Sequence, residues 1–124
     1  MELIIGGRAQ GKLEFALAAD ERLPGDIAYC ATEDYDLIFG KSVVYALHEL
    51  VKRLLADGIS PEEYILPQLK DSHIIICDEV GSGIVPEERG ERAYRDAVGE
   101  ICCAVAAKAD KVTRLICGIP VRIK

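Results

Sequence analysis

The chain has 124 residues, half of them hydrophobic, and carries a formal net charge of −6 at pH 7. This length predicts a single domain spanning residues 1–124, and the hydrophobic content excludes a disordered chain. The acidic balance disfavours binding to nucleic-acid backbones, but it is compatible with a nucleotide held in one local, basic pocket.

A Gly-rich stretch near the N-terminus has the arrangement of a phosphate-binding loop (P-loop). It follows the apolar run 3–5 and precedes a helix predicted over 12–20. In such a loop, backbone N–H groups and the helix N-terminus bind phosphate, and a lysine reaches the terminal phosphates. The residues predicted to bind the nucleotide are Gly6, Gly7, Arg8, Ala9, Gln10, Gly11, Lys12 and Leu13, with Lys12 also catalytic.

One position departs from the motif. The residue after the lysine should be Ser or Thr, whose hydroxyl binds Mg²⁺, and here it is Leu13. The alternative interpretation is an ordinary Gly-rich turn between a strand and a helix. The placement after the first strand favours the phosphate loop.

The rest of the chain alternates between strand and helix patterns, which predicts a three-layer α/β fold with a mainly parallel sheet. The unbroken apolar run 73–77 predicts a central parallel strand. Further strands are expected over 2–5, 27–31, 112–117 and 121–124. Further helices are expected over 42–56 with Ser42 as N-cap, from Ser60 onward, and over 87–109.

Two carboxylates, Asp78 and Glu79, follow the predicted central strand. A carboxylate at this point of a P-loop protein faces the phosphates and orders Mg²⁺ through water, and a following Glu can polarise a nucleophile. Asp78 is therefore the predicted metal residue and Glu79 a predicted catalytic residue. The alternative is that acidic residues simply begin the loop. The segment 81–86 that follows is either a ligand-approach loop or a rigid connection.

Cysteine and histidine usage adds little chemistry. An odd number of irregularly spaced cysteines (30, 77, 102, 103 and 117) predicts reduced thiols in a cytoplasmic protein, not a disulfide framework or a zinc site. A histidine near a nucleotide can act as a covalent nucleophile, but a structural role is favoured for both His48 and His73. No apolar run approaches the roughly 18 residues that a membrane span needs.

Several segments together resemble the adenosylcobinamide kinase / adenosylcobinamide-phosphate guanylyltransferase (CobU) family: residues 6–12, 29–32, 79–86, 94–96 and the C-terminal end. The resemblance implies a P-loop fold of the RecA-like kind, commonly a homotrimer. It implies phosphorylation of the aminopropanol hydroxyl of adenosylcobinamide, then GMP transfer from GTP through a guanylylated His. It also implies GTP or ATP with Mg²⁺, a corrinoid partner, and Thr32 and Glu33 near the nucleotide.

The chain also departs from that family. Besides Leu13, it lacks the Arg-rich segment that carries the nucleophilic His, and the family's middle strand with its acidic residue is expected to be deleted. Cys102 and Cys103 stand where the family usually has Asn-Gln. The leading interpretation is a shortened nucleotide-binding member with kinase activity more than guanylyl transfer. The alternatives are a catalytically silent nucleotide- or partner-binding relative and a small ATPase.

Overall fold

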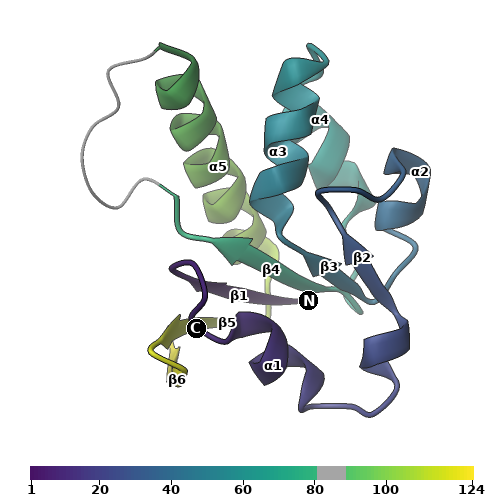
Figure 1. Cartoon of the computed structure of the whole chain (residues 1–124), viewed down its shortest axis with the longest axis vertical. Coiled ribbons are helices and arrows are strands. Elements are labelled where there is room, and N and C mark those ends of the chain that lie inside the picture. The colour runs from purple at the N-terminus through teal and green to yellow at the C-terminus, as the bar shows by residue number, and fades with distance from the viewer. Residues whose placement is uncertain (81–88) are drawn as a thin grey trace.

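A computed structural model of the chain describes residues 1–80 and 89–124, which form one six-stranded sheet with helices on both faces (Figure 1). The strand order is β2-β3-β4-β1-β5-β6, and only β6 runs antiparallel to its neighbour among the strands described. The strands are β1 (Glu2–Gly6), β2 (Ile27–Tyr29), β3 (Val43–Tyr45), β4 (Ile74–Asp78), β5 (Lys111–Ile116) and β6 (Ile119–Arg122). The helices are α1 (Lys12–Leu17), α2 (Tyr35–Ile38), α3 (Leu47–Ala56), α4 (Pro61–Ile65) and α5 (Arg89–Lys108), with 3-10 turns at Leu23–Gly25 and Leu66–Gln68.

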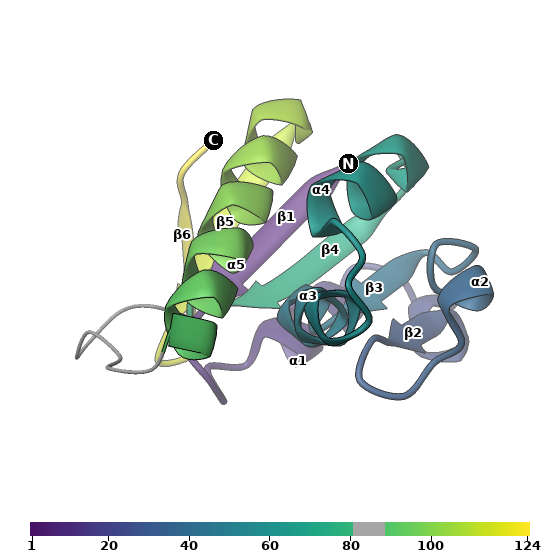
Figure 2. The same ribbon diagram turned by 90° about the horizontal axis from the view of Figure 1, so that it is seen from above.

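The helices make two layers around the sheet, as Figures 1 and 2 show. Side chains alternate along each strand, so Leu3 and Ile75 face α3 and α5, whereas Ile4 and Ile76 face α1. All four are essentially inaccessible to solvent. The predicted three-layer α/β fold with a mainly parallel sheet is confirmed.

Strand β4 occupies the predicted central position, parallel to β3 on one side and to β1 on the other. The register places Gly6 opposite Asp78 on β4 and opposite Leu115 on β5. Because parallel strands end at the same edge, the Gly-rich loop (residues 6–12) leaves β1 directly beside Asp78.

The expectation of one helix over 42–56 is wrong. The segment splits into β3 and α3 at Ala46, whose φ of 65° is left-handed. Ser42 caps no helix; its backbone N–H and its hydroxyl both donate to the Asp26 carboxylate. The reason is burial on two sides: Val43 and Val44 are wholly buried between β2 and β4, an environment that suits β-branched residues in a sheet.

Strand β3 is therefore a strand of the sheet that the sequence analysis did not predict. Strand β3 lies between β2 and β4, and it carries no carboxylate, only two valines and Tyr45. Helix α2 was not predicted. It covers the sheet with the buried Ile38 and the following Phe39. The cap at Ser60 is confirmed, since the Glu63 N–H donates to its hydroxyl at 3.4 Å.

Strand β6 begins earlier than expected and pairs back on β5 through a tight turn at Cys117 and Gly118, both with positive φ. Across residues 1–80 and 89–124, none of the helices has both the length and the apolar character that crossing a membrane requires.

Candidate functional site

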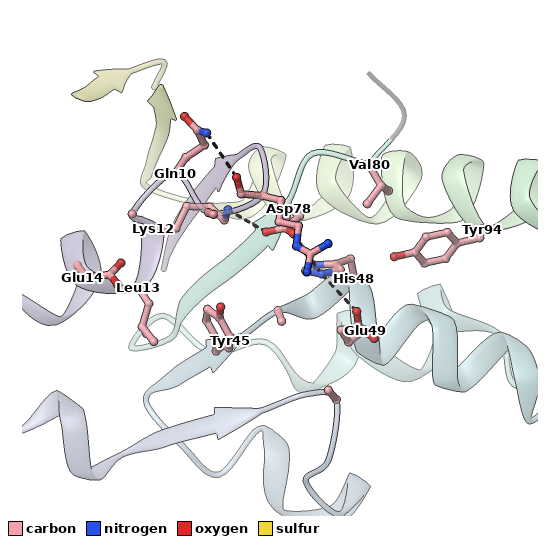
Figure 3. A pocket seen from close by; sticks show the side chains of 15 residues that line it. Gln10, Lys12, Leu13, Glu14, Tyr45, His48, Glu49, Asp78, Val80 and Tyr94 are labelled. Carbon is pink, nitrogen blue, oxygen red and sulfur yellow. Dashed lines mark hydrogen bonds and ion pairs between the residues drawn. The ribbon is translucent and has the colours of Figure 1, made fainter. Parts of the chain in front are cut away.

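A cavity of about 850 Å³ opens at the carboxyl edge of the parallel strands, where ligands of open α/β sheets bind (Figure 3). Its walls come from the Gly-rich loop and the start of α1, from the ends of β2, β3 and β4, and from α3 and α5. The lining residues are Arg8, Ala9, Gln10, Gly11, Lys12, Leu13, Glu14, Ala31, Tyr45, Ala46, His48, Glu49, Asp78, Val80 and Tyr94.

The Gly-rich loop is shaped by close backbone approach. A Cβ on Gly6 would lie 2.7 Å from the Leu115 carbonyl oxygen, so only glycine fits between β1 and β5 there. The Gly6 carbonyl accepts from the Glu79 N–H at 2.8 Å. Ala9 and Gly11 then take left-handed conformations, with φ of 57° and 85°. Such turns direct backbone N–H groups into one concavity, which suits an anion.

The turn between β5 and β6 is hydrogen-bonded to the Gly-rich loop. The Gly118 N–H donates to the Gln10 carbonyl at 3.1 Å, and the Cys117 N–H donates to the Gln10 side-chain oxygen. Gln10, predicted as a nucleotide-binding residue, therefore lines the cavity and also connects the loop to the far edge of the sheet.

Lys12 lies at the floor of the cavity and is only 5% exposed. Its ammonium donates to the Gly7 carbonyl at 2.6 Å and lies 2.8 Å from Asp78 Oδ1 (Figure 3). A buried ammonium is stable only when it is paired and hydrogen-bonded, and Asp78 and the loop supply both. The fold thus brings together two of the residues that the sequence singled out.

His48 completes this cluster, although the sequence favoured a structural role for it. Its Nδ1 accepts the Asp78 N–H at 3.1 Å, so we assign the ring proton to Nε2, which lies 3.5 Å from Asp78 Oδ2 and 3.7 Å from Glu49 Oε1. Burial lowers the pKa of His48, against the raising effect of the Asp78 and Glu49 carboxylates. The imidazole is therefore neutral at pH 7.

Two tyrosines of the cavity wall were missed by the sequence analysis. Burial raises the pKa of Tyr94 to about 12, and burial followed by the Asp78 charge raises the pKa of Tyr45. Both phenols stay protonated at neutral pH. The Tyr45 ring packs edge-on against Tyr29 with centroids 5.6 Å apart. Tyr45 reaches the cavity because it ends β3, and Tyr94 does so because of the side of α5 on which it lies. The residue types alone reveal neither placement.

Other predicted residues lie elsewhere. Glu79 forms a two-pronged ion pair with Arg114 of β5, at 2.7 and 2.9 Å, and is not among the lining residues. Thr32 and Glu33 do not line the cavity, although Ala31 beside them does. Gly6 and Gly7 shape the start of the Gly-rich loop but do not line the cavity. The segment 81–86 lies outside the described residues.

A divalent cation would find few protein ligands here. The described residues contain no group of three or more His, Cys, Asp or Glu side chains that could hold a metal, and Leu13 offers no oxygen. Mg²⁺ in nucleotide sites nevertheless keeps several waters and binds through one or two carboxylates plus the phosphates. Asp78, which has a second carboxylate oxygen beside the one that Lys12 contacts, fits that kind of site.

Comparison with known proteins points to one family. The sequence model of cobinamide kinase / cobinamide phosphate guanyltransferase matches residues 43–123, from β3 past the end of β6. This match takes in Asp78 and His48 and leaves out the Gly-rich loop. It also includes residues 43–78, where the sequence alone had suggested no similarity.

Two curated relatives carry the same name, bifunctional adenosylcobalamin biosynthesis protein CobU. The protein of Salmonella typhimurium (strain LT2) is 45% identical over 51 residues, and that of Escherichia coli (strain K12) is 43% identical over 51 residues. Each match covers 41% of this chain and only 28% of the relative's length.

Proposed function

Because the chain belongs to the cobinamide kinase / cobinamide phosphate guanyltransferase family, we propose that it binds GTP or ATP with the phosphates in the Gly-rich loop. We propose further that it transfers the terminal phosphoryl group to a hydroxyl of a cobinamide, as a step of cobalamin biosynthesis. The proposal extends to this chain a role in adenosylcobalamin biosynthesis that belongs to relatives of which the chain matches only a part.

The observation that carries this proposal is the buried Lys12–Asp78 pair on the cavity floor, 2.8 Å apart. A lysine with 5% exposure serves no purpose in solubility. Its ammonium, beside backbone N–H groups of a loop with left-handed turns, supports the binding of phosphate there.

Each residue then has a distinct role. Lys12 would exchange its bond with the Gly7 carbonyl for phosphate oxygens and neutralise charge that develops on the transferred group. Asp78 would hold Mg²⁺ through water and orient the acceptor hydroxyl. Mg²⁺ supplies further neutralisation of the phosphates when bound. Glu79, ion-paired with Arg114, would position the end of β4.

Guanylyl transfer through histidine is not part of the proposal. A nucleophilic imidazole needs a ring nitrogen with a free lone pair. In His48 the Nδ1 lone pair accepts the Asp78 N–H, and Nε2 carries the proton. The other histidine, His73, is 2% exposed and hydrogen-bonded at both ring nitrogens.

A second candidate function is a nucleotide-binding relative without turnover. The observation that favours it is Leu13, a half-buried apolar side chain on the cavity wall where the phosphate-loop motif has a hydroxyl. Without that ligand, Mg²⁺ would rest on Asp78 and the phosphates alone. Binding would then persist while phosphoryl transfer failed.

One set of assays separates these functions. Calorimetric titration of GTP and ATP, with and without Mg²⁺, should show binding that Mg²⁺ strengthens, and incubation with cobinamide should give phosphorylated cobinamide. Lys12→Ala should weaken binding at least tenfold, because a charge-assisted contact contributes about 1.5–3 kcal/mol. Lys52→Ala, which removes an exposed lysine of α3, is the matched control.

The outcomes are distinct. Binding together with turnover supports the kinase. Binding without turnover supports the silent relative. The absence of binding to either nucleotide would contradict both.

Assembly into a homo-oligomer belongs to the same proposal. The edge strand β6 and the residue after it expose Ile119, Val121 and Ile123, each at least 45% accessible. Apolar side chains grouped along an unpaired edge favour association. Light scattering of the wild type and of Val121→Glu should show a larger mass for the wild type.

A further inference from the structure

Two cysteines that have no part in the proposed function are in direct contact behind the cavity. Cys77 is the residue before Asp78 on β4, and Cys102 is on the facing side of α5. Their sulfurs lie 3.5 Å apart, and the Cys77 thiol also donates to the Asp78 carbonyl at 3.4 Å. Cys77 is 1% exposed, whereas Cys102 is half-buried.

We propose that Cys77 and Cys102 form a reversible dithiol–disulfide site that small disulfides oxidise, linking α5 to β4 next to Asp78. A disulfide bond is about 2.05 Å long, so closure requires the sulfurs to approach by roughly 1.5 Å. That displacement is within the reach of side-chain rotation and a slight shift of the helix.

The difference in exposure between the two thiols assigns the order of events. Reagents reach Cys102 before Cys77, because Cys77 is buried. Cys102 is therefore the attacking thiol and Cys77 the resolving thiol.

The chemistry balances without a metal or an enzyme. The Cys102 thiolate attacks one sulfur of a low-molecular-weight disulfide, and the first small thiolate leaves and takes up a proton. Cys77 then loses its proton to water, and its thiolate attacks the Cys102 sulfur, which releases the second small thiolate, and that thiolate takes up a proton. Two protein thiols are oxidised to one disulfide, and one small disulfide is reduced to two thiols.

A disulfide between Cys77 and Cys102 would change the shape of the cavity because of where these residues lie. Asp78 follows Cys77 directly, and Tyr94 precedes Cys102 by eight residues on the same helix. Both line the cavity. Drawing the sulfurs together would move the Asp78 carboxylate relative to Lys12, which is 2.8 Å away in the reduced form. This coupling, unlike the bond itself, rests on the proposed function.

The test uses a double variant, Cys103→Ser with Cys117→Ser, which removes the two exposed thiols and keeps Cys30, Cys77 and Cys102. Incubation of the folded protein with oxidised glutathione should remove two of its three thiols and two hydrogen atoms of mass, and peptide mapping should find Cys77 joined to Cys102. Dithiothreitol should reverse the change. Adding Cys102→Ser to the double variant should abolish disulfide formation. Should this triple variant not fold, peptide mapping of the oxidised wild-type protein still shows whether Cys77 is joined to Cys102.

A stable glutathione adduct on Cys102 with Cys77 still free would overturn the proposal, as would pairing that involves Cys30. For the coupling, the oxidised form should bind GTP about fivefold or more weakly than the reduced form, a usual size for coupling between sites. Equal affinities would contradict the coupling alone. Absence of both GTP and ATP binding by the reduced protein would contradict the proposed function, while the thiol result would stand.

Discussion

At the scale of single residues, Leu13 distinguishes this Gly-rich loop from phosphate loops that also bind Mg²⁺. Leu13→Ser should strengthen GTP binding in the presence of Mg²⁺ by roughly tenfold, about 1.4 kcal/mol, because a hydroxyl is restored where the cation binds. Affinity measured in EDTA should not change. Calorimetric titration of wild type and variant, with Mg²⁺ and with EDTA, measures both quantities.

Leu17→Ser is the control for this substitution. Leu17 is on the same helix, packs in the same apolar cluster between α1 and the sheet, and does not line the cavity. Both variants should unfold more easily, but only Leu13→Ser should alter the effect of Mg²⁺. An equal gain in EDTA would show that the new side chain acts on the phosphates directly.

Part of the site could be predicted at this scale and part could not. Lys12 and Asp78 follow from a motif and from the end of an unbroken strand, both of which are local patterns. His48 and Tyr45 reach the cavity because a strand ends at Tyr45, and the helical spacing of the surrounding apolar residues concealed that end. Glu79 was predicted from its position beside Asp78, yet its partner Arg114 is distant in sequence.

At the scale of elements, the close approach of β1 and β5 makes Gly6 irreplaceable. Gly6→Ala would place a Cβ 2.7 Å from the Leu115 carbonyl oxygen, so the strands would have to separate. We expect a loss of about 2–3 kcal/mol in the free energy of unfolding, in the range of overpacked cores. Urea unfolding followed by circular dichroism measures this loss.

Gly7→Ala provides the comparison within the same loop. A Cβ there would contact only the Gln10 side chain, at an ordinary 3.6 Å. Its free energy of unfolding should stay within about 0.5 kcal/mol of the wild type. Similar losses for the two variants would mean that conformational freedom, and not the contact with β5, makes glycine necessary at this end of β1.

Helix α3 is tied to the segment after β2 by Arg53. Its guanidinium donates to the Cys30 and Glu33 carbonyls at 2.6 and 2.8 Å, and it lies over the Tyr35 ring at 4.6 Å. Arg53→Ala should destabilise the protein by about 2–3 kcal/mol, since it removes charge-assisted bonds and leaves partly buried carbonyls unpaired. Lys52→Ala, an exposed neighbour, should change little. Hydrogen exchange should accelerate mainly over residues 31–38; a uniform acceleration would contradict this local role.

The elements themselves were predictable where one pattern dominated. The β-branched run before Asp78 predicted the central strand, and the Ser-Pro-Glu-Glu start predicted the cap at Ser60. The residues of β3 were assigned to a helix because Val43 and Val44 also fit the apolar spacing of the helix that follows. Only the neighbours β2 and β4, which are distant in sequence, make that segment extended.

At the scale of the whole molecule, two buried histidines support opposite ends of the central strand. His73 accepts from the Lys70 N–H at 3.0 Å and donates to the Phe39 carbonyl at 2.9 Å just before β4 begins. His48 accepts from the Asp78 N–H where β4 ends. Each acceptor bond needs an unprotonated nitrogen. The integrity of the sheet therefore depends on both rings remaining neutral.

This dependence predicts a loss of stability in mild acid. Burial lowers the pKa of His48 and of His73 below the ordinary value of 6.5. The unfolded chain then binds more protons than the folded one below pH 6.5, so stability is complete above that pH and declines as the pH falls through it. The pKa values of Asp20, Asp26 and Asp110 are also lowered, and these carboxylates reduce stability only at a more acidic pH, below their ordinary pKa of 3.8.

Urea unfolding midpoints at about pH 7.5 and about pH 5.5 isolate the histidine range from the carboxylate range. The wild-type midpoint should be lower at the acidic pH. His73→Gln should be less stable at both pH values, because Gln cannot reproduce both ring contacts. Its midpoint should nevertheless change less between them, because one of the two titrating rings is gone. A wild-type midpoint that is the same at both pH values would mean that protonated rings keep their places in the fold, and the requirement for neutral histidines at the ends of β4 would be wrong.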